Sequence, residues 1–245
     1  MTKTSIIIPT YNGFSMLRSC IEAIRAHTPQ QYEIIVVDNG SKDGTAEYCR
    51  TEKLAFVSLP ANSGFPAACN WGLRLASGEE LLLLNNDVTV SRNWLSNLRS
   101  ALYSSPDTGM VGPVTNYASG RQQVKTTYKG IEEFHRVTEN ANMPDPSKWS
   151  ECRRLVGLCL LFKRELLERT GLLDERFSPG HYEDDDYCFR ARLLGYRLLI
   201  AGDCLVHHEG SASFKRDYNE RLQELVERNR KLFVDKWHID PAVFM

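Results

Sequence analysis

Several features that mark other classes of protein are missing from this chain of 245 residues. No apolar run approaches the ~18–20 residues that a helix needs to span a bilayer. Residues 1–5 lead directly into an expected strand, without the charge and cleavage pattern of a signal peptide. The formal net charge of −1 disfavours a nucleic-acid binder, because such proteins need a basic surface. We therefore expect a cytoplasmic protein with no nucleic-acid partner and at most peripheral contact with the inner face of a membrane.

Motifs of several nucleotide and metal sites are absent as well. The chain contains neither Gly-x-Gly-x-x-Gly nor Gly-x-x-x-x-Gly-Lys-Ser/Thr, so dinucleotide and P-loop binding are disfavoured. A nucleotidyltransferase would need a basic, glycine-rich loop after its first strand, whereas residues 9–13 contain no Lys or Arg. The seven cysteines form no Cys-x-x-Cys pair, and we expect reduced, buried thiols rather than a disulfide framework or a zinc site.

What the chain does contain is an alternation of short apolar strands and amphipathic helices. This alternation predicts one α/β domain with a Rossmann-like, mostly parallel central sheet flanked by helices. The hydrophobic content of 42% suffices for a real core. The expected strands are 5–8, 33–37, 54–59, 81–84, 110–112, 155–162, 197–201 and 204–207. The expected helices are 17–28, 46–51, 67–75, 94–102, 164–170, 182–194 and a charged C-terminal helix marked by 222–233, which we expect to pack on the domain.

The stretch of four leucines at Leu81–Leu84 is the centre of this pattern, because such a run indicates a strand buried on both faces. It ends in Asn85, Asn86 and Asp87. In open α/β sheets the carboxyl end of a central strand faces the crevice where ligands bind. A carboxylate there suits a divalent cation that also holds substrate phosphates, although the same residues favour ordinary turns.

Three other groups of residues contain side chains that can bind a ligand, bind a metal ion or transfer a proton. Two strand ends carry polar residues, 9–12 and 38–41, and Asp38 is either a hydrogen-bond acceptor for a nucleoside or a turn residue. The run of four acids at 183–186 exceeds what a helix N-terminus needs, and a carboxylate there can act as a general base. His207 and His208 follow an expected strand and can complete a Mn²⁺ or Mg²⁺ site with Asp87.

Residues 116–151 show little periodicity, and we expect a functional excursion or a partly mobile flap rather than an ordinary connection. Four aromatic residues in it are either sugar-stacking groups of an acceptor lid or packing groups: Tyr117, Tyr128, Phe134 and Trp149.

In this order, these motifs resemble the family 2 glycosyltransferases of GT-A fold, and most closely the rhamnosyl- and galactofuranosyl-transferase-like branch. The resemblance runs from Ser5 to Ser213 and its pieces are specific in combination. Besides the stretches above, it includes Asn62-Ser63-Gly64-Phe65, Asn70-x-Gly72, Gly171–Phe177, Arg190, Gly195-Tyr196 and His208-x-Gly210-x-x-Ser213.

The resemblance implies a role for each matching residue. The catalytic base would be Asp184, with Glu183 and Asp186 orienting the base or the acceptor. Asp87 would bind the metal, with His208 as the second ligand unless its neighbour His207 takes that place. Asn85 stands where the family's Asp-x-Asp motif has its first acid, which weakens the expected metal site. The nucleotide-sugar-binding residues would be Pro9, Thr10, Tyr11, Asn12, Asp38, Asn39, Gly40, Asn62, Gly64, Asn70, Asn85 and Asn86.

The implied activity is transfer of a sugar, with inversion, from a UDP- or dTDP-linked donor to a hydroxyl of a glycan, glycolipid or glycoprotein in surface polysaccharide or glycoconjugate synthesis. The implied cofactor is a divalent cation, Mn²⁺ or Mg²⁺. Residues 1–113 would form the nucleotide-sugar half, 114–213 the acceptor and catalytic half, with a small acceptor-side subregion, and 214–245 the C-terminal helix. Further domains of a larger enzyme are compatible with this layout. The alternative is a sugar-nucleotide-binding module that has lost catalysis, which Asn85 alone favours.

Overall fold

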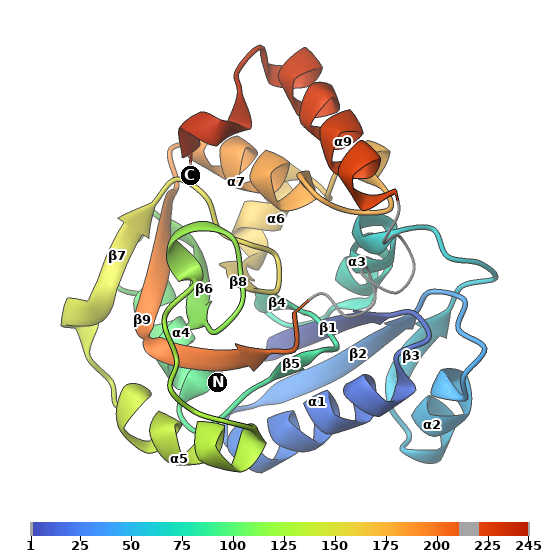
Figure 1. The fold of residues 1–245 in the computed structure, drawn as a ribbon, viewed down its shortest axis with the longest axis vertical. Helices are drawn as coiled ribbons and strands as arrows, with labels where there is room; N and C mark the ends of the chain where they lie inside the picture. Colours follow the sequence, from blue (N-terminus) through green and yellow to red (C-terminus); the bar gives the residue numbers. More distant parts are fainter. Residues whose placement is uncertain (1, 211–220, 245) are drawn as a thin grey trace.

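The computed structural model describes residues 2–210 and 221–244, and within them a nine-stranded mixed sheet lies between two layers of helices (Figure 1). The strand order is β3-β2-β1-β4-β8-β6-β9-β5, and β7 pairs with β9. The strands are β1 (Thr4–Thr10), β2 (Tyr32–Asp38), β3 (Ala55–Ser58), β4 (Glu80–Leu84), β5 (Val88–Thr89), β6 (Thr108–Thr115), β7 (Trp149–Cys152), β8 (Cys159–Lys163) and β9 (Arg197–His208). The helices are α1 (Phe14–His27), α2 (Thr45–Thr51), α3 (Phe65–Leu75), α4 (Trp94–Leu102), α5 (Ile131–Ala141), α6 (Arg164–Thr170), α7 (Glu183–Leu193) and α9 (Leu222–Trp237), with short 3₁₀ turns η1 (Gly120–Gln122), η2 (Pro146–Lys148), η3 (Glu175–Phe177) and η4 (Pro241–Phe244).

The four-leucine strand lies at the middle of the sheet, as predicted. β4 is fully buried and pairs in parallel with β1 and antiparallel with β8. Successive side chains of a strand point to opposite faces. Accordingly, Leu82 and Leu84 join the core beneath α1 and α4, whereas Leu81 and Leu83 join the core beneath α3, α6 and α7. The sheet therefore has an apolar core on each face, which explains why its central strands are continuous hydrophobic runs.

The chain beyond β4 makes the sheet mixed rather than parallel. β8 runs antiparallel to β4 and β6, β6 runs parallel to β9, and β5 pairs antiparallel with the end of β9. The expected strand at 155–162 begins only at Cys159, because residues 155–158 form a loop that supplies backbone N–H groups to the site. The strand expected at 110–112 extends over all of β6.

Two short strands were expected at 197–201 and 204–207, and this prediction was wrong, because β9 is continuous from Arg197 to His208. The polar Gly202-Asp203 pair that suggested a break lies in a bulge, where the register with β6 shifts between Pro113 and Val114. Asp203 is buried and satisfied there, since it accepts hydrogen bonds from the indole of Trp149 (2.9 Å) and from the backbone N–H of Asp145 (2.9 Å).

The segment 116–151 is more regular than its weak periodicity in the sequence suggests. The segment contains α5, two 3₁₀ turns and the start of β7. Only Phe134 and Thr138 of α5 are buried, so the helix exposes most of its residues and its apolar periodicity is weak in the sequence. α5 packs beside β9.

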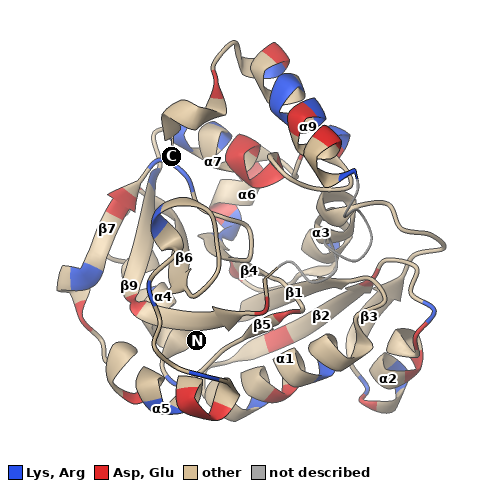
Figure 2. Ribbon diagram, viewed as in Figure 1, with Lys and Arg blue, Asp and Glu red and all other residues tan. Residues whose placement is uncertain are grey.

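α9 packs on the domain across α7, as expected from its mixed charges (Figures 1 and 2). Phe233 of α9 is fully buried against Phe177 and Phe189. The amide of buried Asn229 donates to the backbone carbonyls of Phe177 (2.6 Å) and Gly180 (2.8 Å). α9 therefore holds the loop that leads into the acidic run of α7.

α9 also neutralises one acid of that run. Asp186 is fully buried and accepts hydrogen bonds from Lys236 (2.6 Å), Trp237 (2.8 Å) and Arg190 (2.9 Å).

All seven cysteines lie within the described residues and are buried and unpaired, as predicted. No described helix is both long enough and apolar enough to cross a membrane.

The contact between α9 and Asp186 gives a prediction for stability. We expect Lys236→Met to lower the free energy of unfolding by about 1–3 kcal/mol, because a buried carboxylate loses a charge-assisted hydrogen bond. Lys231→Met is the matched control, since Lys231 is exposed on the same helix. Urea unfolding of both variants measures the difference, and equal midpoints would show that the Lys236 contact contributes nothing.

Candidate active site

The carboxyl ends of β1, β2 and β4 meet at one edge of the sheet. Thr10 at the end of β1 lies beside Asp38 at the end of β2 in the parallel register. The amide of Asn86, just after β4, donates to the Thr10 hydroxyl (2.8 Å). The polar ends of these three strands therefore lie side by side at one edge of the sheet.

Asp38 is fully buried and organises its own loop. Its carboxylate accepts hydrogen bonds from the backbone N–H of Ser41 (2.9 Å) and the hydroxyl of Ser58 (2.7 Å). The neighbouring Gly40 has φ +84°, and an added Cβ would lie 2.8 Å from the backbone of Ala61. The close approach of two loops therefore requires glycine at this position.

Other predicted nucleotide residues hold the loops around this edge. Asn39 donates to Asn62 (2.9 Å), and Asn62 accepts from the backbone N–H of Gly64 (3.0 Å). The side chain of Asn12 accepts from the backbone N–H of Lys42 (2.8 Å). Tyr11 is half-buried next to Asn12, and Pro9 is buried within β1.

Asn70 lies apart from the strand ends. Its amide donates to the carbonyl of Leu173 (2.9 Å) and the carboxylate of Glu175 (2.8 Å), and its carbonyl oxygen accepts from the N–H of Leu173 (2.9 Å). The structure therefore shows Asn70 tying α3 to the loop before η3, and it does not bring this residue to the other predicted nucleotide residues.

The two predicted metal ligands lie together. The antiparallel pairing of β5 with β9 sets Val88 opposite His208, so Asp87 is adjacent to that histidine. Asp87 Oδ1 lies 3.2 Å from His208 Nε2, and both residues are buried. His207 points to the other side of β9, where its Nδ1 lies 2.9 Å from the Tyr128 hydroxyl. His208 rather than His207 therefore faces Asp87, because alternate residues of a strand point to opposite sides.

The ring of His208 is oriented so that Nε2 offers a lone pair. Nδ1 lies 2.8 Å from the carbonyl oxygen of Tyr117, which can only accept, so Nδ1 carries a proton. When the ring is neutral, the lone pair of Nε2 faces the negatively charged carboxylate of Asp87. This arrangement is repulsive unless a proton or another cation lies between the two atoms. Burial alone would lower the pKa of His208, but Asp87 outweighs it and the pKa is raised. The pair is therefore a site that attracts a cation.

The described part of the chain contains no group of three or more His, Cys, Asp or Glu side chains placed to hold a metal ion. A pair of protein donors still fits Mn²⁺ or Mg²⁺, since Mg²⁺ is usually bound through one or two protein carboxylates together with substrate phosphates and water. Asn85, two residues before Asp87, lines the same cavity as His208, and its buried Oδ1 makes no hydrogen bond among the described residues.

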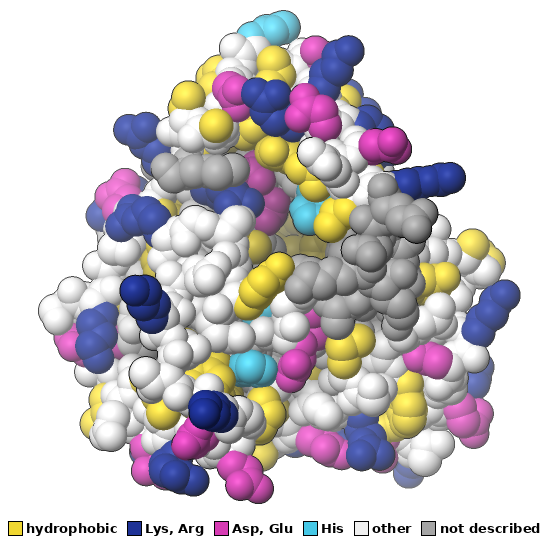
Figure 3. Space-filling view, in the orientation of Figure 1, with side chains coloured by type: hydrophobic (Ala, Val, Ile, Leu, Met, Phe, Trp, Pro, Cys, Tyr) yellow, Lys and Arg dark blue, Asp and Glu magenta, His cyan; other side chains and the backbone are white. Residues whose placement is uncertain are grey.

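Asp184 lines a cavity of about 470 Å³ that Asn85, just after β4, and His208 also line. Its Oδ2 accepts from the backbone N–H of Gly157 (2.9 Å) and its Oδ1 from the N–H of Asp185 (3.0 Å). Acidic side chains and histidines gather around the hollow at the centre of the face in Figure 3. The residues with polar side chains that line this cavity are Asn85, Tyr117, Ser119, Gln123, Arg154, His181, Tyr182, Glu183, Asp184, Asp185 and His208.

A buried arginine partly compensates the acidic run. Arg154 Nε lies 2.6 Å from Asp185 Oδ1, and the Arg154 side chain is only 13% exposed. Burial and the charge of Asp184 raise the pKa of Asp185 to about 7, although Arg154 opposes this shift. Burial also raises the pKa of Glu183 well above its usual range, with Asp184 adding to the effect. The crowded acids therefore do not all ionise at neutral pH, which explains how four of them tolerate one helix end.

Asp186 does not line the cavity, because it faces α9 and is held by the three donors described above. Its predicted role beside the acceptor is therefore not supported by its position. Of the four aromatic residues proposed for a lid, only Tyr117 lines the cavity, while Phe134 is fully buried and packs against Tyr128.

Sequence reasoning missed Arg154 and Gly157. The need for a cation near four crowded acids was a usable signal, but no spacing in the sequence selects Arg154 among the 30 Lys and Arg residues. Gly157 contributes a backbone N–H, which carries no sequence signature.

This mixed sheet between two layers of helices has the GT-A fold of glycosyltransferases. The family model "Glycosyl transferase family 2" matches residues 5–171. The chain belongs to this family. The branch within the family rests on the motif resemblance alone.

Three similar proteins illustrate the relationship. An uncharacterized protein, y4gI, of Sinorhizobium fredii is 30% identical over 85% of this chain and 24% of its own length. Glycosyltransferase AglE of Haloferax volcanii is 29% identical over 96% of this chain and 74% of its own length. The mannosyltransferase PcManGT from Pyrobaculum calidifontis, solved with GDP-Man and Mn²⁺, has a TM-score of 0.68 and 25% identity, covering 95% of this chain and 64% of that one. The chain thus spans about a quarter of the Sinorhizobium relative.

Proposed function

We propose that this chain is an inverting glycosyltransferase that moves a hexose-type sugar from a nucleoside-diphosphate sugar to a hydroxyl of a glycan, glycolipid or glycoprotein. The observation that carries the proposal is the buried pair of Asp87, just after β4, and His208, at the end of β9, because His208 also lines the cavity that holds Asp184. A cation-attracting pair and a buried carboxylate across one cavity are the two groups that this transfer needs.

The donor would lie along the ends of β1, β2 and β4. The loops that follow Thr10 and Asp38 would hold the nucleoside, with Asn86 and Asn85 next to the diphosphate and sugar. Asp87 and His208 would hold a divalent cation at the diphosphate, and such a cation offsets negative charge on the departing nucleoside diphosphate. The Mn²⁺ bound in the complex of PcManGT supports this assignment.

Asp184 would act as the general base. An acceptor hydroxyl in the cleft attacks the anomeric carbon as its proton passes to Asp184, and the bond from that carbon to the diphosphate oxygen breaks on the opposite side, so the configuration inverts. The N–H groups of Gly157 and Asp185 fix the carboxylate in place for this step. Glu183, whose Oε2 is buried without a hydrogen bond among the described residues, would be placed to orient the acceptor.

Calorimetric titration of UDP, dTDP and GDP, each with and without Mn²⁺, tests the proposal and identifies the base. We expect one nucleotide to bind at micromolar concentration and at least tenfold more tightly with Mn²⁺. Donor sugars on that nucleotide, rhamnose and galactofuranose first, then test the branch. Tight, metal-dependent binding without turnover of any donor would favour a catalytically inactive binding module, and failure of all three nucleotides to bind would refute the donor site.

A further inference from the structure

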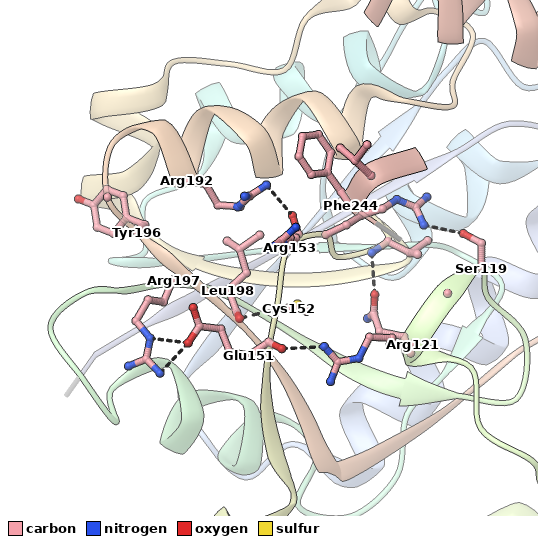
Figure 4. A pocket seen from close by; sticks show the side chains of 16 residues that line it. Ser119, Arg121, Glu151, Cys152, Arg153, Arg192, Tyr196, Arg197, Leu198 and Phe244 are labelled. Atoms are coloured by element: carbon pink, nitrogen blue, oxygen red, sulfur yellow. Dashed lines mark hydrogen bonds and ion pairs between the residues drawn. The ribbon is translucent and has the colours of Figure 1, made fainter. Parts of the chain in front are cut away.

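A second and larger cavity, of about 660 Å³, lies next to the acceptor side of the cleft (Figure 4). It is enclosed by η1, by β7, by the C-terminal end of α7, by the start of β9 and by Phe244 of η4. Its volume is within the range of small-molecule sites. The donor loops after β1 and β2 contribute nothing to it.

The lining of this cavity is strongly cationic. Five arginines surround it, with Glu151 as the acid among the lining residues: Arg121, Arg153, Arg154, Arg192 and Arg197. Two of the five are matched by carboxylates. Arg154 pairs with Asp185, and Arg197 pairs with Glu151 (3.0 Å).

The other three arginines lack such partners. Within residues 2–210 and 221–244, no ion pair joins Arg121, Arg153 or Arg192 to a carboxylate. Arg121 donates instead to the backbone carbonyl of Glu151 (2.8 Å), and the Arg192 guanidinium lies 4.8 Å from the ring centre of Phe244. Burial and the nearby charge of Arg153 lower the pKa of Arg192. Positive charges that line one cavity without a paired acid favour any anion that enters it.

Arginine suits one chemical class of ligand in particular. Its planar guanidinium offers parallel N–H groups that match the oxygens of phosphate, diphosphate and carboxylate groups. Contacts with Glu151 and Phe244 hold two of these guanidinium groups at the cavity wall before any ligand arrives (Figure 4).

The arginine cavity adjoins the catalytic cleft. Ser119, Arg154 and Val156 line both. Arg154 lies between them, since Nη1 donates to the Ser119 hydroxyl (2.8 Å) while Nε faces Asp185. A molecule with its anionic group among the arginines could therefore extend past Arg154 and present a hydroxyl to Asp184.

We propose that the cavity lined by Arg121, Arg153 and Arg192 binds an oxyanion group of the acceptor, a phosphate, diphosphate or carboxylate, and so selects anionic acceptors. This inference rests on the proposed function, because it assigns the acceptor side of that same site. The donor diphosphate is excluded as the occupant, since its proposed place is at the strand ends beside Asp87.

Inorganic sulfate is the probe, because it is a dianionic oxyanion. We expect calorimetry in EDTA-containing buffer to show sulfate binding that the double variant Arg153→Gln/Arg192→Gln weakens at least tenfold. The matched control is Arg18→Gln/Arg50→Gln, which removes two charges from side chains that are 57% and 63% exposed on α1 and α2. Circular dichroism and thermal unfolding establish that each variant is folded. Equal sulfate affinity in the two double variants, or no binding by the wild-type protein at matched ionic strength, would overturn the inference.

A separate titration distinguishes an acceptor's anion from a free anionic effector. UDP is titrated with Mn²⁺ into wild-type protein with and without saturating sulfate. An affinity for UDP that stays within about twofold supports a site for the acceptor, whereas a tenfold change would indicate an effector and refute the acceptor assignment. If a panel of nucleotides that includes UDP fails to bind while sulfate still binds, the proposed donor site fails and the anion site stands.

Discussion

Asp184→Asn should abolish sugar transfer while leaving nucleotide affinity within about twofold of wild type. The substitution keeps the size of the side chain and one oxygen for the N–H of Gly157, but it removes the group that would accept the proton of the attacking hydroxyl. Loss of a general base costs typically 10²–10⁴-fold in rate. The nucleotide would bind at the strand ends on the other side of the cavity, so its affinity should be unaffected.

The measurement is a single-turnover rate with the donor that the nucleotide panel identifies, together with a UDP, dTDP or GDP titration of the same variant. Asp186→Asn serves as a comparison, since that residue faces α9 rather than the cavity and should affect stability more than turnover. Full activity of Asp184→Asn would refute its role as base. Glu183 would then become the candidate, because it lines the same cavity and, unlike Asp185, has no ion pair with Arg154.

Asp87→Ala should remove the effect of Mn²⁺ on nucleotide binding. The change deletes the only carboxylate of the proposed cation pair and leaves His208 with one neutral nitrogen for the metal. Altering residues that merely support metal ligands costs ~10–100-fold in metal affinity. We therefore expect loss of a direct ligand to cost at least about a hundredfold.

Calorimetry with and without Mn²⁺ measures this loss directly, and thermal unfolding checks that the variant is folded. Asp235→Ala is the control for removing an acid, because Asp235 is exposed on α9. His208→Ala should reproduce the loss, whereas His207→Ala should not, since His207 faces Tyr128 on the opposite side of β9. Nucleotide binding by Asp87→Ala that still responds to Mn²⁺ would show that the cation, if it binds, is held elsewhere.

Much of the first half of the fold could be predicted from the sequence because the relevant signals are local. The strands around Ile6–Ile8 and Leu81–Leu84 are continuous apolar runs, and such runs identify buried strands without knowledge of their partners. The polar residues at their ends are equally local features. The second half was harder, since β9 tolerates Gly202 and Asp203 through a bulge whose contacts come from β7 and η2.

For the candidate site too, local features could be predicted from the sequence, whereas contacts between distant elements could not. The sequence by itself determined which residue types stand at the strand ends, the presence of the acidic run before α7, and the family to which these motifs point. Only the tertiary structure decided that His208 rather than His207 faces Asp87, that Arg154 compensates Asp185, and that Asp186 belongs to the contact with α9. Each of these decisions depends on which face of a strand or helix meets an element distant in the chain. Local periodicity fixes the faces, but strand pairing and helix packing fix the neighbours.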